Sequence, residues 1–281
     1  MKSRDSRDDS GTAGRDREVM APGEAPRECD SERTARRSVP TLSGVLRGLA
    51  DVVFPPVCVQ CRGVVEGGAL RHVCARCEAM IHRVEAPNCT TCGHPFFGEV
   101  EGERLCPHCE GMHPLYSEGR TATLFKGPAR ALIHELKYHH GLHVLADIEA
   151  IVRTSPHVAD FVRDGILVPV PLHSRKERER GYNQTMLLAG AFARAAGGLT
   201  KVESLLKRVI DTPSQTAFDR QARRTNLKNA FALRSGATIT PASPYILIDD
   251  VFTTGSTLNS CAGVFRRAGA LNLRVVTFGH G

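Results

Sequence analysis

Eight of the ten cysteines stand in four Cys-x-x-Cys pairs, and this spacing constrains the fold more than any other feature of the chain. The loops between successive pairs are 12, 11 and 13 residues long. A tight turn aims both thiolates of a pair at one ion, and a tetrahedral zinc site needs two such turns brought together. The block therefore predicts a double zinc ribbon over residues 57–113, and a ribbon this small needs its metal to fold. The eight expected ligands of its two structural zinc sites are Cys58, Cys61, Cys74, Cys77, Cys89, Cys92, Cys106 and Cys109.

The pairing of these turns and the state of the cysteines leave alternatives open. Joining the first pair with the second and the third with the fourth closes the shortest loops, so we prefer it to an interleaved arrangement. Disulfides are the main alternative to zinc, and a redox role for one pair is a weaker one. The start of the chain, MKSRDSRDDS, lacks the apolar segment of a secretory signal. With no apolar run of about 18 residues, the sequence predicts a cytoplasmic protein without a membrane span, where disulfides are disfavoured.

The N-terminal 40 residues differ in composition from the rest. They contain no aromatic residue and are rich in charged and small residues, so they cannot bury enough apolar surface to fold. We expect a disordered tail over 1–40, in which Cys29 has no role, and an amphipathic helix over 41–56 that ends at two prolines. The tail's nine basic and nine acidic residues cancel, so the net charge of +7 comes from residues 41–281. That excess suits phosphates or nucleic acid, although a solvated surface would carry the same charge.

Residues 118–281 alternate between short buried apolar runs and amphipathic stretches. This alternation predicts an α/β domain with a mainly parallel sheet and helices on both faces. The expected strands cover 121–125, 166–172, 245–248 and 271–278, and the expected helices cover 127–140, 183–198 and 257–268.

The stretch YILIDDVFTTGST, residues 245–257, carries the most specific chemistry of this domain. Asp249 and Asp250 follow an apolar run, at the strand end where open α/β sheets bind ligands. The next turn presents hydroxyls and backbone N–H groups at a helix start, which is an anion site. The carboxylates can hold sugar hydroxyls or Mg²⁺, so the stretch predicts a site for a ribose phosphate.

This stretch resembles the phosphoribosyl pyrophosphate motif of type I phosphoribosyltransferases. The resemblance implies a phosphoribosyltransferase-like fold that takes phosphoribosyl pyrophosphate together with Mg²⁺. It also implies that Asp249 and Asp250, the candidate catalytic pair, bind the ribose 2- and 3-hydroxyls, and that the following loop binds the 5-phosphate. The implied binding residues are Asp249, Asp250, Thr253, Thr254, Gly255, Ser256 and Thr257.

Three further segments resemble the ComF family. They are LKYHHGLHVLA (136–146), VPVPLHSRKERERGYNQTMLLA (168–189) and LLKRVIDTPSQTAFDRQARRTNLKNAF (205–231). The order of parts is also similar: an apolar helix, a paired Cys-x-x-Cys ribbon and a phosphoribosyltransferase-like domain. The resemblance covers about residues 42–281 and implies a part in DNA uptake during natural transformation.

Two basic segments are candidates for contacts with pyrophosphate or DNA. In the fold that the resemblance implies, the loop after the strand at 166–172 faces the pyrophosphate, and the stretch around 212–226 matches a hood loop over the site. A solvated helix is the alternative reading of the first segment. The candidates are His173, Arg175, Arg180, Arg223 and Arg224.

Several functions remain open from the sequence. In purine phosphoribosyltransferases an aspartate often handles the proton of the base at the position of Thr253, and threonine cannot act as a base at neutral pH. Binding of phosphoribosyl pyrophosphate, with salt-dependent binding of single-stranded DNA, is therefore better supported than transfer. The alternatives are a true phosphoribosyltransferase acting on a small metabolite or nucleobase, and a zinc-organised scaffold without a nucleotide ligand. A homodimer and a contact with the DNA-uptake machinery stay open as further associations.

Overall fold

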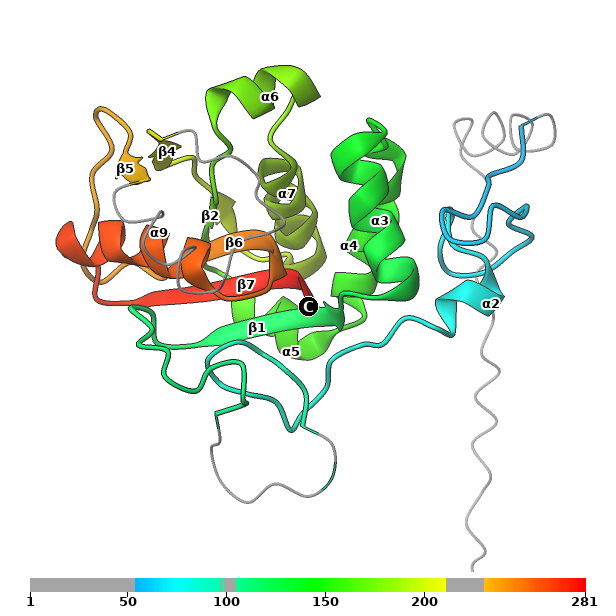
Figure 1. Cartoon of the computed structure of the whole chain (residues 1–281), viewed down its shortest axis with the longest axis horizontal. Coiled ribbons are helices and arrows are strands. Elements are labelled where there is room, and N and C mark those ends of the chain that lie inside the picture. The colour runs from blue at the N-terminus through cyan, green and yellow to red at the C-terminus, as the bar shows by residue number, and fades with distance from the viewer. Residues whose placement is uncertain (1–53, 97, 99–104, 211–229) are drawn as a thin grey trace, which may run out of the picture. The chain divides into compact units, whose positions relative to one another are not determined.

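The structure, a computed structural model, describes residues 54–96, 98, 105–210 and 230–281 (Figure 1). Three predictions lie outside these residues. They are the tail over 1–40, the part of the predicted helix 41–56 that precedes residue 54, and the candidates Arg223 and Arg224. Within the described part of the chain, no helix has the length and apolar character needed to cross a membrane.

A five-stranded sheet forms the centre of residues 118–281, and all of its strand pairs are parallel. The strand order is β1-β7-β6-β2-β3. The bounds are β1 Gly119–Leu124, β2 Ile166–Pro169, β3 Lys201–Val202, β6 Tyr245–Phe252 and β7 Leu273–His280. The prediction of a mainly parallel sheet is confirmed. A separate antiparallel pair joins β4 Leu206–Arg208 to β5 Phe231–Leu233, and the sequence analysis did not foresee it.

Helices cover both faces of the sheet, as predicted (Figure 1). The helices α3, α4, α5 and α7 share one core cluster with the even-numbered β6 residues Ile246 and Ile248. Helix α9 shares the other with Tyr245 and Leu247. The bounds are α3 Gly127–Tyr138, α4 Leu145–Arg153, α5 Pro156–Val162, α6 Ser174–Arg180, α7 Gln184–Ala196 and α9 Ser256–Arg267, with a short 3-10 turn η1 at Leu142–Val144.

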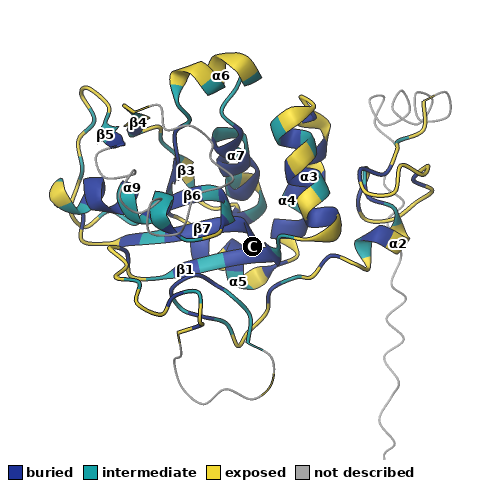
Figure 2. Cartoon of the chain, viewed as in Figure 1, coloured by how far each residue is buried: buried dark blue, intermediate teal, exposed yellow. Residues whose placement is uncertain are grey.

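Three of these helices refine the sequence reading. Helices α4 and α5 were not predicted, although α4 buries Ile148, Ile151 and Val152 along one side. Helix α6 buries none of its residues, so the solvated-helix reading of the segment after β2 is correct locally (Figure 2). Left-handed Gly181 ends it, at a φ of 74° that glycine adopts without strain.

The two halves of the cysteine block pack into different core clusters. Cys58, Val59 and Leu70 of the first half join the cluster of α3, α4 and α7, whereas all four cysteines of the second half join the cluster of α9. The short helix α2, Ala75–Glu78, carries Cys77 in the first half. Each half of the ribbon is therefore attached to its own face of the α/β domain.

Candidate functional site

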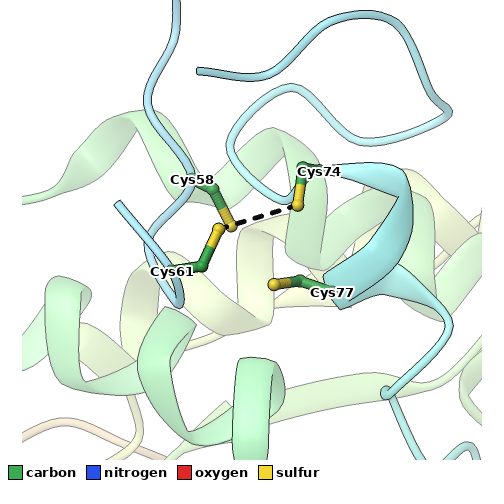
Figure 3. Close-up of side chains that lie close together, drawn as sticks. All are labelled: Cys58, Cys61, Cys74 and Cys77. Atoms are coloured by element: carbon green, nitrogen blue, oxygen red, sulfur yellow. Dashed lines mark hydrogen bonds between the residues drawn. The ribbon is translucent and has the colours of Figure 1, made fainter. Parts of the chain in front are cut away.

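The first half of the ribbon brings Cys58, Cys61, Cys74 and Cys77 together, and their sulfur atoms converge on one point (Figure 3). The four sulfurs lie within 4.8 Å of one another, and the Sγ atoms of Cys61 and Cys74 are 3.8 Å apart. Tetrahedral zinc with bonds of about 2.3 Å needs sulfurs about 3.8 Å apart. Burial and the neighbouring thiols raise the pKa of Cys77 to about 12, and a bound cation would favour its thiolate.

The second half brings Cys89, Cys92, Cys106 and Cys109 together in the same way. All four are buried, and the Sγ atoms of Cys92 and Cys106 are 3.4 Å apart. Both sites thus fit structural zinc, and the preferred pairing of the first turn with the second and the third with the fourth is confirmed.

The residue directly after the first and after the third cysteine pair has a left-handed backbone conformation, with a different residue type in each turn. Gly93 directly follows the third pair at a φ of 74°, which glycine adopts without strain. At the equivalent place after the first pair, Arg62 takes a φ of 62°. Gly63 follows it without a positive φ, and its carbonyl accepts a hydrogen bond of 2.8 Å from the Cys58 N–H.

A buried carboxylate attaches the first half of the ribbon to helix α4. Asp147 is 2% exposed and accepts hydrogen bonds from the backbone N–H groups of Arg71 (2.8 Å) and His72 (2.7 Å). Charge-assisted bonds of this kind are among the stronger single contacts in proteins.

Strand β6 runs through the two acids instead of ending before them. It continues to Phe252 because β6 pairs with β7 as far as His280. Side chains alternate along a strand, so Asp249 points to the α9 face with Leu247, and Asp250 points to the α3 and α7 face with Ile248. The two carboxylates therefore have separate surroundings.

Asp250 forms an ion pair and a hydrogen bond with two residues that were not among the candidates from the sequence. Its Oδ2 atom lies 2.6 Å from the Lys137 ammonium of α3 and accepts a hydrogen bond of 3.2 Å from the Gln184 amide of α7. The Gln184 side-chain oxygen in turn accepts a hydrogen bond of 2.8 Å from the guanidinium of Arg180, one of the predicted candidates. A single polar network thus connects the segment after β2 to the acid of β6. Both new residues lie within segments that carry the ComF resemblance, which was the available signal.

Asp249 is only partly exposed. Burial and the neighbouring Asp250 carboxylate raise the pKa of Asp249 to about 7, although the Asp250 N–H, Lys137 and Arg208 lower it in part. Cys261 of α9 is fully buried, and burial together with Asp249 raises the pKa of its thiol well above the ordinary value. Cys261 is therefore a neutral core residue.

The loop after β6 turns into α9 at Gly255, whose φ is 67°. A Cβ atom there would lie 2.6 Å from the Phe252 ring and 2.7 Å from the Met112 methyl, so the loop requires glycine. Helix α9 begins at Ser256, one residue earlier than predicted, and its glycine cap supplies no side-chain acceptor. First-turn N–H groups have no partner within the helix, so they and the Thr254 and Ser256 hydroxyls, 2.9 Å apart, suit an anion.

The other candidates from the first basic segment lie on α6. His173 caps this helix by accepting a hydrogen bond of 3.3 Å from Arg175 N–H, and the Arg175 side chain lies 3.6 Å from Glu179. Arg180, the third candidate of this segment, is joined to Asp250 of β6 through Gln184.

The second half of the ribbon contacts the same loop and helix. The Asn259 side chain of α9 accepts from Leu115 N–H (2.7 Å) and donates to the His113 carbonyl (3.2 Å), and Arg266 donates to the Leu115 carbonyl (2.7 Å). With Met112 against Gly255, residues 112–115 form a strap across α9.

Comparisons with known proteins agree with this architecture. A family model described as double zinc ribbon domain matches residues 49–110. Competence protein F of Haemophilus influenzae is 28% identical over 222 residues, which cover 78% of this chain and 94% of that protein. DNA utilization protein YhgH of Salmonella typhimurium is 28% identical over 230 residues, covering 80% and 96%. Competence protein ComFC of Bacillus subtilis is 24% identical over 201 residues, covering 68% and 76%.

Among solved structures, a hypoxanthine phosphoribosyltransferase from Staphylococcus aureus matches with a TM-score of 0.29 and 12% identity, over 48% of this chain and 62% of that chain.

Proposed function

We propose that this chain, which is a homologue of the ComF-type competence and DNA-utilization proteins, binds phosphoribosyl pyrophosphate with Mg²⁺, binds single-stranded DNA and acts in DNA uptake. The observation that carries the sugar-phosphate half is one continuous element: the acids of β6, then a glycine-dependent hydroxyl loop, then the start of α9.

Each part of this element suits one part of the ligand. Backbone N–H groups at the start of a helix favour a phosphate, and carboxylates suit ribose hydroxyls or Mg²⁺. Lys137 now neutralises Asp250, at 2.6 Å, so a ligand that approaches Asp250 has to compete with an ammonium group. Mg²⁺ would supply positive charge between the carboxylates and the pyrophosphate.

The DNA half rests on charge and on the relatives' names. The net charge of +7 belongs to residues 41–281, and backbone phosphates are bound mainly through such charge. The relatives are named for competence and DNA utilization, which supports the same role here.

Titration calorimetry with phosphoribosyl pyrophosphate and Mg²⁺ tests the sugar-phosphate half. We expect Mg²⁺-dependent binding by the wild-type protein and binding at least about tenfold weaker in Asp249→Asn and Asp250→Asn, since each loses a charged contact. Asp160→Asn on α5 is the matched control, because this carboxylate is 67% exposed and forms only a surface pair with Arg163. Absence of binding by the wild-type protein would refute this half.

The position of Asp249 favours a second function, a true phosphoribosyltransferase acting on a small metabolite or nucleobase. This carboxylate is partly exposed at the β6 end, and burial together with the Asp250 carboxylate raises its pKa, which suits a general acid or base. Pyrophosphate release from phosphoribosyl pyrophosphate with a panel of nucleobases distinguishes the two, because binding alone releases none.

A further inference from the structure

We propose that the exposed face of helix α3 is the surface on which single-stranded DNA stacks. This inference rests on the DNA half of the proposed function and adds where the strand binds. The face consists of Lys126, Arg130, His134 and Tyr138, which we call the α3 stripe.

The spacing of the stripe places its members on successive turns. They follow one another at intervals of four residues, so each lies next to the one before it, turned by about 40° around the helix axis, starting from the residue that caps it. All four are exposed, and Tyr138 is 60% exposed. Figure 2 shows exposed positions along α3. The opposite side of α3 is buried and includes Leu132, Ile133 and Leu136. The stripe is therefore the solvent-facing side of an amphipathic helix. Such a side usually carries acidic and basic residues together, whereas the stripe carries basic side chains and aromatic rings.

Three flat groups meet at the C-terminal end of the stripe. The rings of His134 and Tyr138 have centroids 4.7 Å apart, and the Arg180 guanidinium lies 5.3 Å from the centre of the Tyr138 ring. The imidazole of His139 continues the group, 5.4 Å from that of His134. Bases stack on aromatic rings and on guanidinium planes without regard to sequence, so this group suits the bases of a single strand.

The N-terminal part of the stripe forms one wall of a surface cavity of about 350 Å³. Arg130 and His134 line it from α3, and Gln60 and Arg62 line it from the first half of the zinc ribbon. Its acidic residue, Glu135, has a side chain only 13% exposed that already lies 3.9 Å from the Arg62 guanidinium. The cavity thus presents cations without an exposed competing acid, which suits backbone phosphates.

The stripe also leads to the proposed sugar-phosphate site. Arg180, which covers Tyr138, donates to Gln184, and Gln184 donates to Asp250. A strand lying on the stripe would end near the acids of β6, so one face would join both halves of the proposed function.

Fluorescence anisotropy with a labelled oligothymidine tests the assignment on the full-length, zinc-loaded protein. We expect Tyr138→Leu to weaken binding about five- to 150-fold and Tyr138→Phe to bind like the wild type, because stacking needs a ring and no hydroxyl. We expect Arg130→Glu to weaken binding and to lower the slope of log affinity against log salt by about 0.7 or more. The charge control is Lys201→Glu, on an exposed residue of the edge strand β3.

The outcomes separate the inference from the function on which it rests. If the wild-type protein does not bind the oligothymidine, the DNA half of the proposed function fails and the inference with it. If it binds and the stripe variants bind equally well, the inference alone is overturned. Equal binding of a duplex, or loss of phosphoribosyl pyrophosphate binding in Tyr138→Leu, would also overturn it, because the effect would then not come from stacking on this face.

Discussion

The buried carboxylate of Asp147 should control how firmly the first half of the zinc ribbon is attached. Asp147→Ala removes two charge-assisted hydrogen bonds to backbone N–H groups, of 2.8 and 2.7 Å, at a side chain that is 2% exposed. Such bonds contribute about 1.5 to 3 kcal/mol each, so the expected loss in free energy of unfolding is about 3 to 6 kcal/mol. Asp147→Asn keeps one acceptor oxygen and should lose about half as much.

Urea unfolding and zinc transfer to a chromogenic chelator measure this effect. We expect the zinc ion of the first half to transfer faster in Asp147→Ala, because the segment between Cys61 and Cys74 then loses its two buried hydrogen bonds to α4. Asp160→Ala is the control, since the surface pair of Asp160 should be worth less than about 1 kcal/mol. The reasoning would be refuted if Asp147→Ala unfolded at the same urea midpoint as this control and transferred both of its zinc ions slowly to the chelator.

Two further predictions concern the turn after the third cysteine pair and the acid of β6. Gly93→Ala should cost about 1 to 3 kcal/mol more than Gly111→Ala: both positions have positive φ, but a Cβ at Gly93 would lie 2.5 Å from the Thr121 nitrogen whereas Gly111 has open space. Equal losses in thermal melts would contradict this. The pKa of Asp249 is raised from 3.8 to about 7, so its stabilising contribution is present below pH 4 and lost as the pH rises through 7. Asp249→Asn should therefore match the wild type in free energy of unfolding at pH 4 and exceed it by up to roughly 4 kcal/mol at pH 8. Thermal melts that show the same difference between the two proteins at both pH values would exclude this raised pKa.

The sequence predicted those features whose signal is local. The Cys-x-x-Cys turns carry their own geometry, so the two zinc sites could be predicted from spacing, and the lengths of the loops favoured the pairing that the structure has. The buried runs around Leu167 and Leu247 are continuous and apolar, which is typical of parallel strands covered on both faces. The antiparallel pair of β4 and β5 has three residues in each strand, too few to show a period.

The surroundings of the β6 acids could not be predicted in this way. Lys137 reaches Asp250 only because α3 packs over the sheet next to α7, and no pattern within α3 encodes that contact. The sequence placed both acids just after the strand, which left their directions open. Continued pairing of β6 with β7 sends the two carboxylates to opposite faces, and this depends on residues near the end of the chain.

The strap of residues 112–115 has a consequence for synthesis on the ribosome. Its partners Asn259 and Arg266 follow it by 144 and 151 residues, so the strap leaves the ribosome long before the helix it crosses exists. The second half of the ribbon can bind its metal at once, but its packing partners on α9 are made last. Contacts between residues this far apart in the sequence form slowly. Loss of the last two elements, α9 and β7, would expose the four buried cysteines of the second half together with the inner side of the sheet. Truncated chains should therefore present an apolar surface that is prone to aggregation and that α9 and β7 cover in the finished protein.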